Sequence, residues 1–321
     1  MEQELRRRYA NGTIDVMEIG LVLPTIGKGA NAAGIEAGAA IAARLGWSSV
    51  WVTDHLMVAP GPEADEYGTI LEAVVALTYI AARFEDLTIG TSAIIPPLRN
   101  SVLLAKELAT LDVLSKGRLV VGVGVADAAD RAEFDNLGVG TRFEHRGDLV
   151  NETIALWRHL WSGEEGPFEG RFHDLRDYVF RPLPAQGGKL PIWTGGRSRR
   201  ALVRAATLAD GYHAAQTGPD DLLARIPELS RLSDEAGRPM PTLSVRARVR
   251  FDREPGAKYS MAGTRAEIAK EVERFAEAGA QHLVVVLEET EADRIIAAAQ
   301  RFHDEAVVPA IGHPGGGHSP R

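Results

Sequence analysis

Short apolar runs alternate along the chain with longer stretches in which apolar residues recur at helical spacing. Many of the runs are apolar throughout, as strands of a parallel sheet are when both of its faces are covered. The runs predict strands at 19–24, 49–54, 87–95, 118–125, 190–196, 210–216, 243–251 and 282–288. The stretches between them predict helices at about 33–45, 68–84, 101–115, 144–162, 197–208, 219–236, 264–278 and 290–304.

Eight strand-helix pairs in strict alternation predict an α/β fold, a (β/α)8 TIM barrel. A doubly wound sheet is the second choice, because it usually needs fewer units. No linker rich in Pro, Gly or Ser divides the chain, so residues 17–308 are expected to form a single catalytic domain. We expect residues 1–16 to be a disordered N-terminal extension and residues 309–321 to be a flexible tail.

Two longer irregular stretches predict insertions into the barrel. Residues 126–143 follow strand 4, and residues 163–189 lie between helix 4 and strand 5, with a small hairpin expected around Gly166 or Gly170. Local signals also mark where helices begin. Ser101 precedes a helical run, and Thr264 followed by Glu267 three residues later predicts a capping box.

Composition and charge narrow the class of protein. The chain is 45% hydrophobic and 25% charged, which is typical of a globular protein, and its 36 Lys and Arg against 44 Asp and Glu give a net charge of −8. That balance argues against general binding to nucleic acid or a membrane surface. The absence of Cys excludes disulfides and thiolate chemistry. No signal peptide and no long apolar span is recognisable, so a cytoplasmic enzyme acting on a small molecule is expected.

In a TIM barrel the catalytic residues lie at the carboxyl ends of the strands. The scattered His residues lack a zinc-binding pattern, so no metal site is expected, and no nucleophile elbow of a hydrolase occurs. The rule therefore yields a set of polar or small residues at strand ends as candidates. They are Pro24, Thr25, Asp54, His55, Ser92, Gly124, Asp127, Gly195 to Ser198, Gln216, Arg246, Arg248 and Glu288.

The segment TGGRSRRALVRAA (194–206) resembles a phosphate cradle in its chemistry. Gly195 and Gly196 let a ligand approach the backbone, the next helix offers free N–H groups, and Arg197 and Ser198 add a cation and a hydroxyl. The alternative is a glycine turn with solvated Arg residues.

The other candidates each have a functional and a structural interpretation. Gly124 narrows the end of strand 4 so that a flat ring can approach, whereas Asp127 beyond it either titrates or serves as a solvated cap. His55 either exchanges a proton with a ligand or bonds structurally beside Asp54. The VGVGVADAAD run lacks the third glycine of a dinucleotide fingerprint.

Arg246 and Arg248 lie two residues apart on one strand and therefore share a face. If that face points inward, they hold an anionic group of the substrate or cofactor. If it points outward, they form ion pairs, and of the two we favour the outward arrangement. Thr25 and Gln216 complete the candidate substrate-binding residues.

Several segments together resemble the bacterial-luciferase-like oxidoreductases, and most closely the branch that uses the deazaflavin coenzyme F420. The segments are WVTDHL, TSAIIPPLRNSVLLAKELATLDVLSKGRLVVGVGV, EFDNLGVGTRFEHRGDLVNETIALWRHLW and PIWTGGRSRRALVRAATLADGYH. They occur in the family's order across about residues 18–251.

The resemblance implies a barrel that binds FMN or F420 in its mouth. Many relatives have a non-proline cis peptide in strand 3, which falls here at Thr91-Ser92-Ala93. Ser92 and Ala93 would contact the cofactor ring, Asp54 and His55 match the cofactor-facing pair, and Gly195 to Ser198 match the phosphate-binding turn.

The chain also departs from the family's patterns. FMN-using members usually have Arg at the end of strand 4, where this chain has Val125, and this difference favours F420. Sugar-phosphate dehydrogenases have an aromatic residue and a Glu where this chain has Ala59 and Asp127, which argues against glucose 6-phosphate as substrate.

The resemblance implies an F420-dependent oxidoreductase that transfers hydride to or from a small organic substrate, with His55 or Asp127 handling the proton. An FMN-dependent monooxygenase and a non-catalytic cofactor-binding protein are the alternatives. A separate reductase and a homodimer formed through the apolar stretch 70–82 are expected partners. Because the chain is acidic overall, we expect the positive charge that holds the cofactor to come from Arg197, Arg199 and Arg200.

Overall fold

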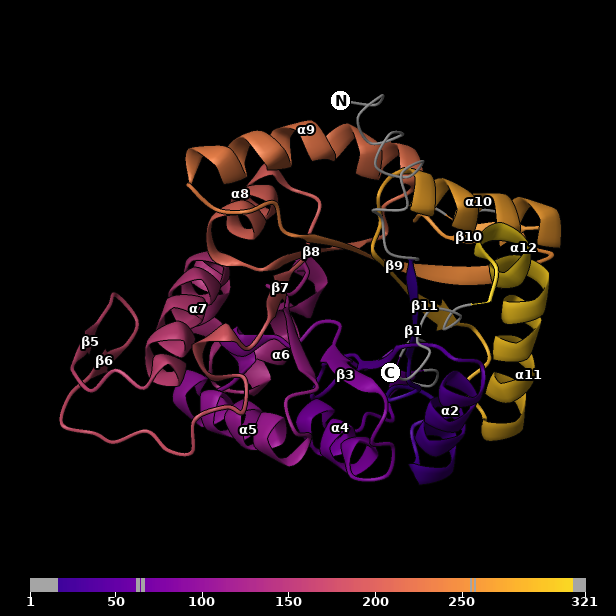
Figure 1. The fold of residues 1–321 in the computed structure, drawn as a ribbon. Coiled ribbons are helices and arrows are strands. Elements are labelled where there is room, and N and C mark those ends of the chain that lie inside the picture. Colours follow the sequence, from indigo (N-terminus) through magenta and orange to yellow (C-terminus); the bar gives the residue numbers. More distant parts are fainter. Residues whose placement is uncertain (1–16, 62–63, 65–66, 255, 257, 314–321) are drawn as a thin grey trace, which may run out of the picture.

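Parallel strands close on themselves into a barrel at the centre of the molecule (Figure 1). The computed structural model describes residues 17–313, apart from residues 62–63, 65–66, 255 and 257. The barrel strands are β1 (Glu18–Val22), β2 (Ser49–Val52), β3 (Thr88–Thr91), β4 (Leu119–Val123), β7 (Ile192–Thr194), β8 (Gly211–Ala215), β9 (Thr242–Phe251) and β11 (His282–Leu287). Each pairs with its neighbours in parallel, and the pairings of β8 with β9 and of β11 with β1 close the ring.

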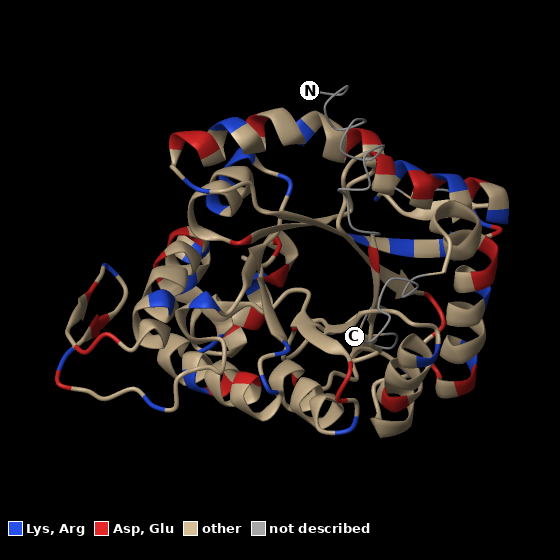
Figure 2. Cartoon of the chain, in the orientation of Figure 1, with Lys and Arg blue, Asp and Glu red and all other residues tan. Residues whose placement is uncertain are grey.

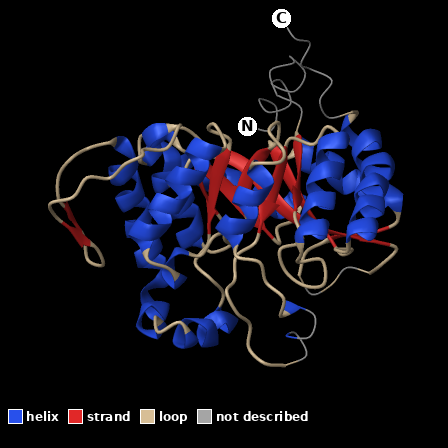
Figure 3. Cartoon of the chain, turned by 90° about the horizontal axis from the view of Figure 1, so that it is seen from below, coloured by secondary structure: helices blue, strands red, loops and turns tan. Residues whose placement is uncertain are grey.

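A helix follows almost every strand and covers the outside of the barrel, as Figures 1 and 3 show. The main helices are α2 (Ala32–Arg44), α4 (Ala73–Ala81), α5 (Ser101–Leu114), α7 (Arg146–Ser162), α8 (Arg199–Leu208), α9 (Pro219–Glu235), α10 (Arg265–Glu277) and α11 (Ala292–Phe302). The short strand β10 (Met261–Gly263) extends the sheet beside the end of β9. The predicted (β/α)8 barrel is therefore confirmed.

Both predicted insertions are present. The segment after β4 contains η2 (Ala128–Asp130), α6 (Arg131–Asn136) and η3 (Gly140–His145). The segment after α7 contains a hairpin of β5 (Phe168–Glu169) and β6 (Asp174–Leu175), which stands away from the barrel in Figures 1 and 3. Its turn begins at Gly170, in agreement with the second of the two predicted positions.

The remaining elements are short. Two further turns are 3-10 helices, η1 (Pro96–Leu98) and η4 (Gly187–Lys189). After α11 the chain continues through a π-helical turn, η5 (His303–Val307), into α12 (Val308–Ile311). Residues 309–311 are thus helical, where the sequence analysis expected the start of the tail. The expected N-terminal extension, and the tail from residue 314 onward, lie outside the described residues.

Two apolar cores stabilise the barrel. The larger lies between strands and helices, and a smaller one fills the barrel interior around Trp51 and Trp193, whose ring centroids are 5.2 Å apart. Glycines on neighbouring strands make room for these rings: a Cβ at Gly90 would lie 2.3 Å from Trp51, and one at Gly211 would lie 2.3 Å from Trp193. The indole layer closes the interior below the carboxyl ends of the strands.

Charge lies mostly on the helices and loops, and Figure 2 shows most strands free of it. β9 is different, because Arg side chains recur along it. No helix in the described part of the chain is both long and apolar enough to cross a bilayer.

Candidate active site

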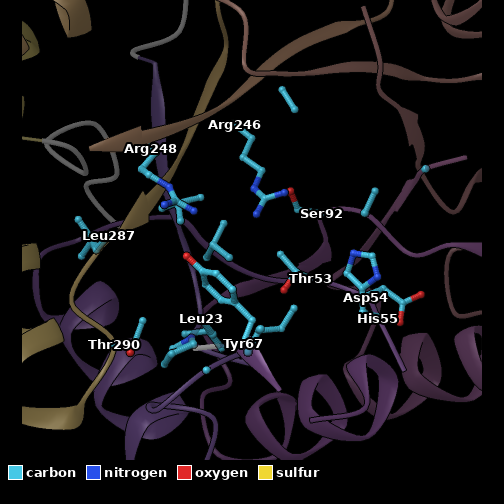
Figure 4. A pocket seen from close by; sticks show the side chains of 18 of the residues that line it. Leu23, Thr53, Asp54, His55, Tyr67, Ser92, Arg246, Arg248, Leu287 and Thr290 are labelled. Atoms are coloured by element: carbon cyan, nitrogen blue, oxygen red, sulfur yellow. The ribbon is translucent and has the colours of Figure 1, made fainter. Parts of the chain in front are cut away.

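A cavity of about 960 Å³ opens at the carboxyl ends of the strands, where a TIM barrel places its active site (Figure 4). Its walls come from the ends of β1 to β4, β7 to β9 and β11 and from the loops after them. It contains most of the predicted site residues, namely Asp54, His55, Ser92, Ala93, Gly124, Asp127, Gly195, Gly196, Arg246 and Arg248. Four others, Thr25, Arg197, Ser198 and Gln216, are outside its lining.

His55 lies in the cavity wall directly after β2 and bonds an acid from the insertion that follows β4. Its Nδ1 lies 2.9 Å from Oε2 of Glu133, and the amides of Leu56 and Met57 donate to the other carboxylate oxygen at 2.6 and 3.1 Å. The hydrogen bond to Glu133 raises the pKa of His55, although burial opposes this. Burial disfavours the charged form of Glu133, but the three hydrogen bonds outweigh it and lower its pKa.

Asp54 directs its carboxylate toward the protein. Oδ1 accepts a hydrogen bond from Arg99 at 2.7 Å, and Oδ2 accepts one from the Ile95 amide at 2.8 Å. Burial raises the pKa of Asp54 to about 6, while Arg99 and the amide favour the ionised form. Asp54 thereby fixes the turn after β3, and of the Asp-His pair it is His55 that remains half-exposed.

Ser92 and Ala93 form part of the cavity at the end of β3, and the peptide bond between them is cis. The resemblance predicted a cis peptide in this segment, and that prediction is confirmed. Ser92 Oγ lies 2.8 Å from Nε2 of His213, and Nδ1 of His213 lies 2.8 Å from Oγ of Ser244. One chain of hydrogen bonds therefore joins the end of β3 to β8 and β9, which lie elsewhere around the barrel.

His213 is also held by stacking. Its ring lies on Trp51 with centroids 5.3 Å apart and planes 13° apart. Burial lowers the pKa of His213 to about 3, and the nearby Arg246 adds to this shift. His213 is therefore neutral at physiological pH and can serve only as a fixed donor and acceptor between two hydroxyls.

Gly195 and Gly196 line the cavity after β7, as predicted. A Cβ at Gly195 would lie 2.5 Å from the carbonyl oxygen of His213, and Gly196 has a φ of +121°. Both positions thus require glycine. The rest of the predicted cradle points elsewhere: Ser198 caps its own helix, accepting from the Ala201 amide at 3.3 Å, and Arg197 is exposed.

Arg199 was also expected to provide positive charge for the cofactor beside this turn. It forms an ion pair with Glu228 at 3.0 Å instead.

Asp127 is exposed at the rim of the cavity and belongs to a turn. Its amide donates to Oδ2 of Asp130 at 2.6 Å. The acid that reaches His55 is Glu133, six residues further on. Glu133 was not among the predicted site residues, because no local pattern distinguishes it from other acids on a short helix.

Thr25 and Gln216 do not contact the cavity. Thr25 is fully buried, and its hydroxyl lies 3.2 Å from that of Thr53, which does line the cavity. Gln216 is half-buried and has a φ of +53° just after β8. Thr25 supports a lining residue from behind.

Arg246 and Arg248 both line the cavity, so the outward arrangement favoured from the sequence is wrong. The reason lies in the register of β9. Ser244 faces the barrel interior, where it bonds His213, and residues two and four positions later point to the same side. Figure 4 shows both guanidinium groups entering the cavity.

The described residues contain no cluster of three or more His, Asp or Glu side chains arranged to hold a metal ion. The polar groups of the cavity include the imidazole of His55, the buried pair Ser92–His213, the guanidinium groups of Arg246 and Arg248, and the acidic loop that begins at Glu288. Apolar side chains such as Leu23, Ile95 and Val286 separate them.

Comparisons with known proteins identify the family. Residues 17–307 match the family described as luciferase-like monooxygenases. An F420-dependent glucose-6-phosphate dehydrogenase of Intrasporangium calvum is 31% identical over 67% of this chain and 65% of its own length. A 5,10-methylenetetrahydromethanopterin reductase of Methanolobus tindarius is 26% identical over 65% of this chain and 58% of its own. The chain spans about two thirds of the length of the first curated relatives, between 61 and 67%.

Solved structures share the fold. An F420-dependent secondary alcohol dehydrogenase in complex with an F420-acetone adduct superposes with a TM-score of 0.77 at 20% identity, covering 92% of this chain and 99% of the other. A Type II Baeyer-Villiger monooxygenase from Pseudomonas putida in complex with FMN gives 0.72 at 15% identity, covering 94% and 99%. Since the family match includes nearly the whole described barrel, the chain belongs to the luciferase-like monooxygenase family.

Proposed function

We propose that the protein is an oxidoreductase that uses coenzyme F420 to transfer a hydride to or from a small organic substrate. The proteins compared above include F420-dependent dehydrogenases and, among the solved structures that share the fold, a monooxygenase in complex with FMN. The observation that favours F420 is the end of β4, where Val125 lines the cavity at the position that carries a phosphate-binding Arg in FMN-using members.

The residues of the cavity fit a flat ring joined to a phosphate-bearing chain. Ala93 and Gly124 form a narrow wall with little side-chain bulk, and a Cβ added at Gly124 would lie 3.4 Å from that of Ala93. Gly195 and Gly196 leave backbone exposed at the start of α8, where a phosphate would be stabilised by the helix N-terminus. We propose that these two walls hold the ring and the phosphate.

When bound, the deazaflavin supplies a ring carbon that accepts or donates a hydride. The chain's own residues then have defined tasks. The Ser92–His213–Ser244 chain keeps the β3 end in one position. In the tautomer that carries its proton on Nε2, His213 donates to Ser92 and leaves the Ser92 hydroxyl free to donate into the cavity.

His55 is the proposed proton carrier. Its Nδ1 is taken by Glu133, so Nε2 is the nitrogen left to exchange a proton with the substrate. Glu133 raises the pKa of His55, which extends the pH range in which the imidazole can act as an acid. Asp127 is the second candidate, at the exposed rim.

A turnover assay tests the proposal. The purified full-length chain is incubated under anaerobic conditions with F420 and a panel of secondary alcohols, and with reduced F420 and a panel of ketones and enones. We expect the deazaflavin absorbance to change with at least one substrate. We expect the rate to fall by at least about a hundredfold in His55→Gln, the lower end of a typical general acid contribution.

Two outcomes would replace the proposal. Substrate oxygenation with reduced FMN and oxygen, without turnover of F420, would make the protein an FMN-dependent monooxygenase. Tight cofactor binding with no hydride transfer across the whole panel would make it a cofactor-binding protein on a barrel scaffold. If F420 is the cofactor, a separate reductase that regenerates its other redox state is the proposed partner.

A further inference from the structure

Two guanidinium groups enter the cavity from the same strand. Arg246 and Arg248 are on the inner face of β9, where they follow Ser244 at intervals of two residues. Strand residues two apart are separated by about 6.5 Å, which places the two side chains one above the other. Arg246 is the deeper of the two and half-buried, whereas Arg248 is exposed near the cavity mouth.

Neither cation forms an ion pair within the described part of the chain, although acids are close by. Glu288 lies in the same cavity but binds Arg250 at 2.9 Å and Arg253 at 3.2 Å. In addition, Nε of Arg246 is buried without a hydrogen-bond partner among the described residues.

This arrangement is costly for the protein alone. The buried Nε of Arg246 has lost its hydration and has gained no hydrogen bond among the described residues, which costs free energy. Burial lowers the pKa of Arg246 to about 10, and the neighbouring Arg248 contributes to the shift, so Arg246 remains charged at neutral pH. The net charge of the chain is −8, which makes two unpaired cations at one place more unusual still.

We propose that Arg246 and Arg248 form a binding site for a carboxylate of the substrate, so that the substrate is a small organic acid. The planar fork of a guanidinium matches a carboxylate in shape and charge, and two forks can hold one carboxylate from two sides. This inference rests on the proposed function, because it assigns the substrate class of the same cavity.

The position of Arg246 and Arg248 indicates that they bind the substrate rather than the phosphate of the cofactor. The glycines proposed to hold the phosphate follow β7, whereas Arg246 is on β9, with β8 between them. Arg246 also follows Ser244, the last member of the hydrogen-bonded chain that reaches Ser92, and Figure 4 shows its guanidinium on the side of Ser92. A carboxylate held there lies beside the wall proposed to contact the ring.

Matched pairs of acids and amides test this site directly. Benzoate with benzamide, and hexanoate with hexanamide, are titrated into the full-length chain by calorimetry at low salt, without cofactor and again with F420. We expect each acid to bind at least about tenfold more tightly than its amide, which corresponds to about 1.4 kcal/mol. In Arg246→Met and Arg248→Gln the preference is expected to fall to about one.

Arg253→Gln is the matched control. It removes one positive charge, as the cavity variants do, but the charge of Arg253 is already paired with Glu288. It is expected to keep the preference for acids, and Arg248→Lys is expected to keep part of it. If Arg246→Met does not fold, the exposed Arg248 and its two variants decide the question.

The proposal is overturned if the wild-type chain does not prefer acids, or if Arg253→Gln loses the preference as fully as the cavity variants. It is also overturned if the cavity variants weaken F420 binding tenfold but leave the acid preference unchanged, since the pair would then serve the cofactor. Failure of F420 to bind at all would contradict the proposed function, yet the acid preference measured without cofactor would stand.

Discussion

At the scale of single residues, the site depends on side chains that meet only in the folded protein. Glu133 reaches His55 from a helix that lies 78 residues further along the chain, and His213 bonds Ser92 across a separation of 121 residues. The sequence pointed to His55 and Ser92 because they end strands. Their partners carry no local signal, so no pattern in the sequence could have identified them.

The His55–Glu133 pair predicts a pH-dependent contribution to stability. His55 has a raised pKa in the fold, so its contribution is complete below its ordinary value of 6.5 and is lost as the pH rises through the raised pKa. Glu133 has a lowered pKa, so its contribution is present above 4.5 and is lost as the pH falls through the lowered value. The pair therefore stabilises most between about pH 4.5 and 6.5.

Replacing Glu133 with Gln should remove this dependence. Denaturant unfolding across the pH range is expected to show the largest loss of stability between those two values and a smaller loss above. The exposed Glu144 lies in the same insertion, and Glu144→Gln is expected to leave the profile unchanged. A loss in Glu133→Gln that is constant with pH would show that the pair does not titrate as described.

We expect the contribution of His213 to stability to be independent of pH, because this residue is neutral throughout the physiological range. In His213→Phe the aromatic stack is retained, but the hydroxyls of Ser92 and Ser244 lose their partner. Each buried group left unpaired costs about 1–3 kcal/mol, so for the two hydroxyls we expect a loss of about 2–6 kcal/mol in unfolding free energy, equal at pH 5 and pH 8. A loss below about 1 kcal/mol would mean that the hydrogen-bonded chain contributes little.

At the scale of elements, the sequence predicted the eight barrel strands and the helices between them, with ends that differ by a few residues. Apolar runs identify buried strands whatever their partners are, which explains this success. The ends are set by caps and by tertiary contacts. The helix expected at 68–84 is limited to Ala73–Ala81, because Glu72 caps it, accepting from the amide of Val75 at 2.7 Å.

The cap of α5 likewise differs from the residue predicted from the sequence. Ser101 was expected to begin this helix as its cap, but Asn100 is the cap, and its Oδ1 accepts from the amides of Val102 and Leu103 at 3.0 Å. The predicted capping box of Thr264 and Glu267 at the start of α10 is confirmed.

These contacts predict that Asn100→Ala lowers the unfolding free energy by about 1 kcal/mol, whereas Asn100→Asp is nearly neutral because its carboxylate can accept the same bonds. Thermal or denaturant unfolding of the two variants provides the comparison. Equal stability of the Ala variant and the wild type would rule out Asn100 as the cap.

At the scale of the whole molecule, the barrel exposes apolar side chains on two adjacent helices. Val75 on α4 is 69% exposed and Leu103 on α5 is 57% exposed. The two helices lie side by side in Figure 1 and contact each other. We propose that a second copy of the chain covers this face, because single exposed apolar residues are common but a shared face on neighbouring helices marks an interface.

Sedimentation of the wild-type chain is expected to show a dimer, and Val75→Glu with Leu103→Glu is expected to give a monomer that is still folded. Val179 follows the hairpin and is 70% exposed, so Val179→Glu provides a control with a similar change at another surface. A wild-type monomer at micromolar concentration would contradict the proposal.

The whole cavity also shows why function was only partly predictable from sequence. The barrel rule and the family resemblance identified the strand ends correctly, but the side on which Arg246 and Arg248 lie depends on the register of β9. A shift of one residue would have moved both to the outer face. The substrate is recognised by such side chains, and their directions become known only once the strand is placed in the barrel.

The central claim is that this cavity holds F420 in preference to FMN, and the most direct measurement is a pair of equilibrium titrations of the purified chain with each cofactor, followed by fluorescence. The account predicts a dissociation constant for F420 at least about tenfold below that for FMN, a difference of about 1.4 kcal/mol, with the preference reduced in Val125→Arg. Tight binding of FMN with no detectable binding of F420 would contradict it.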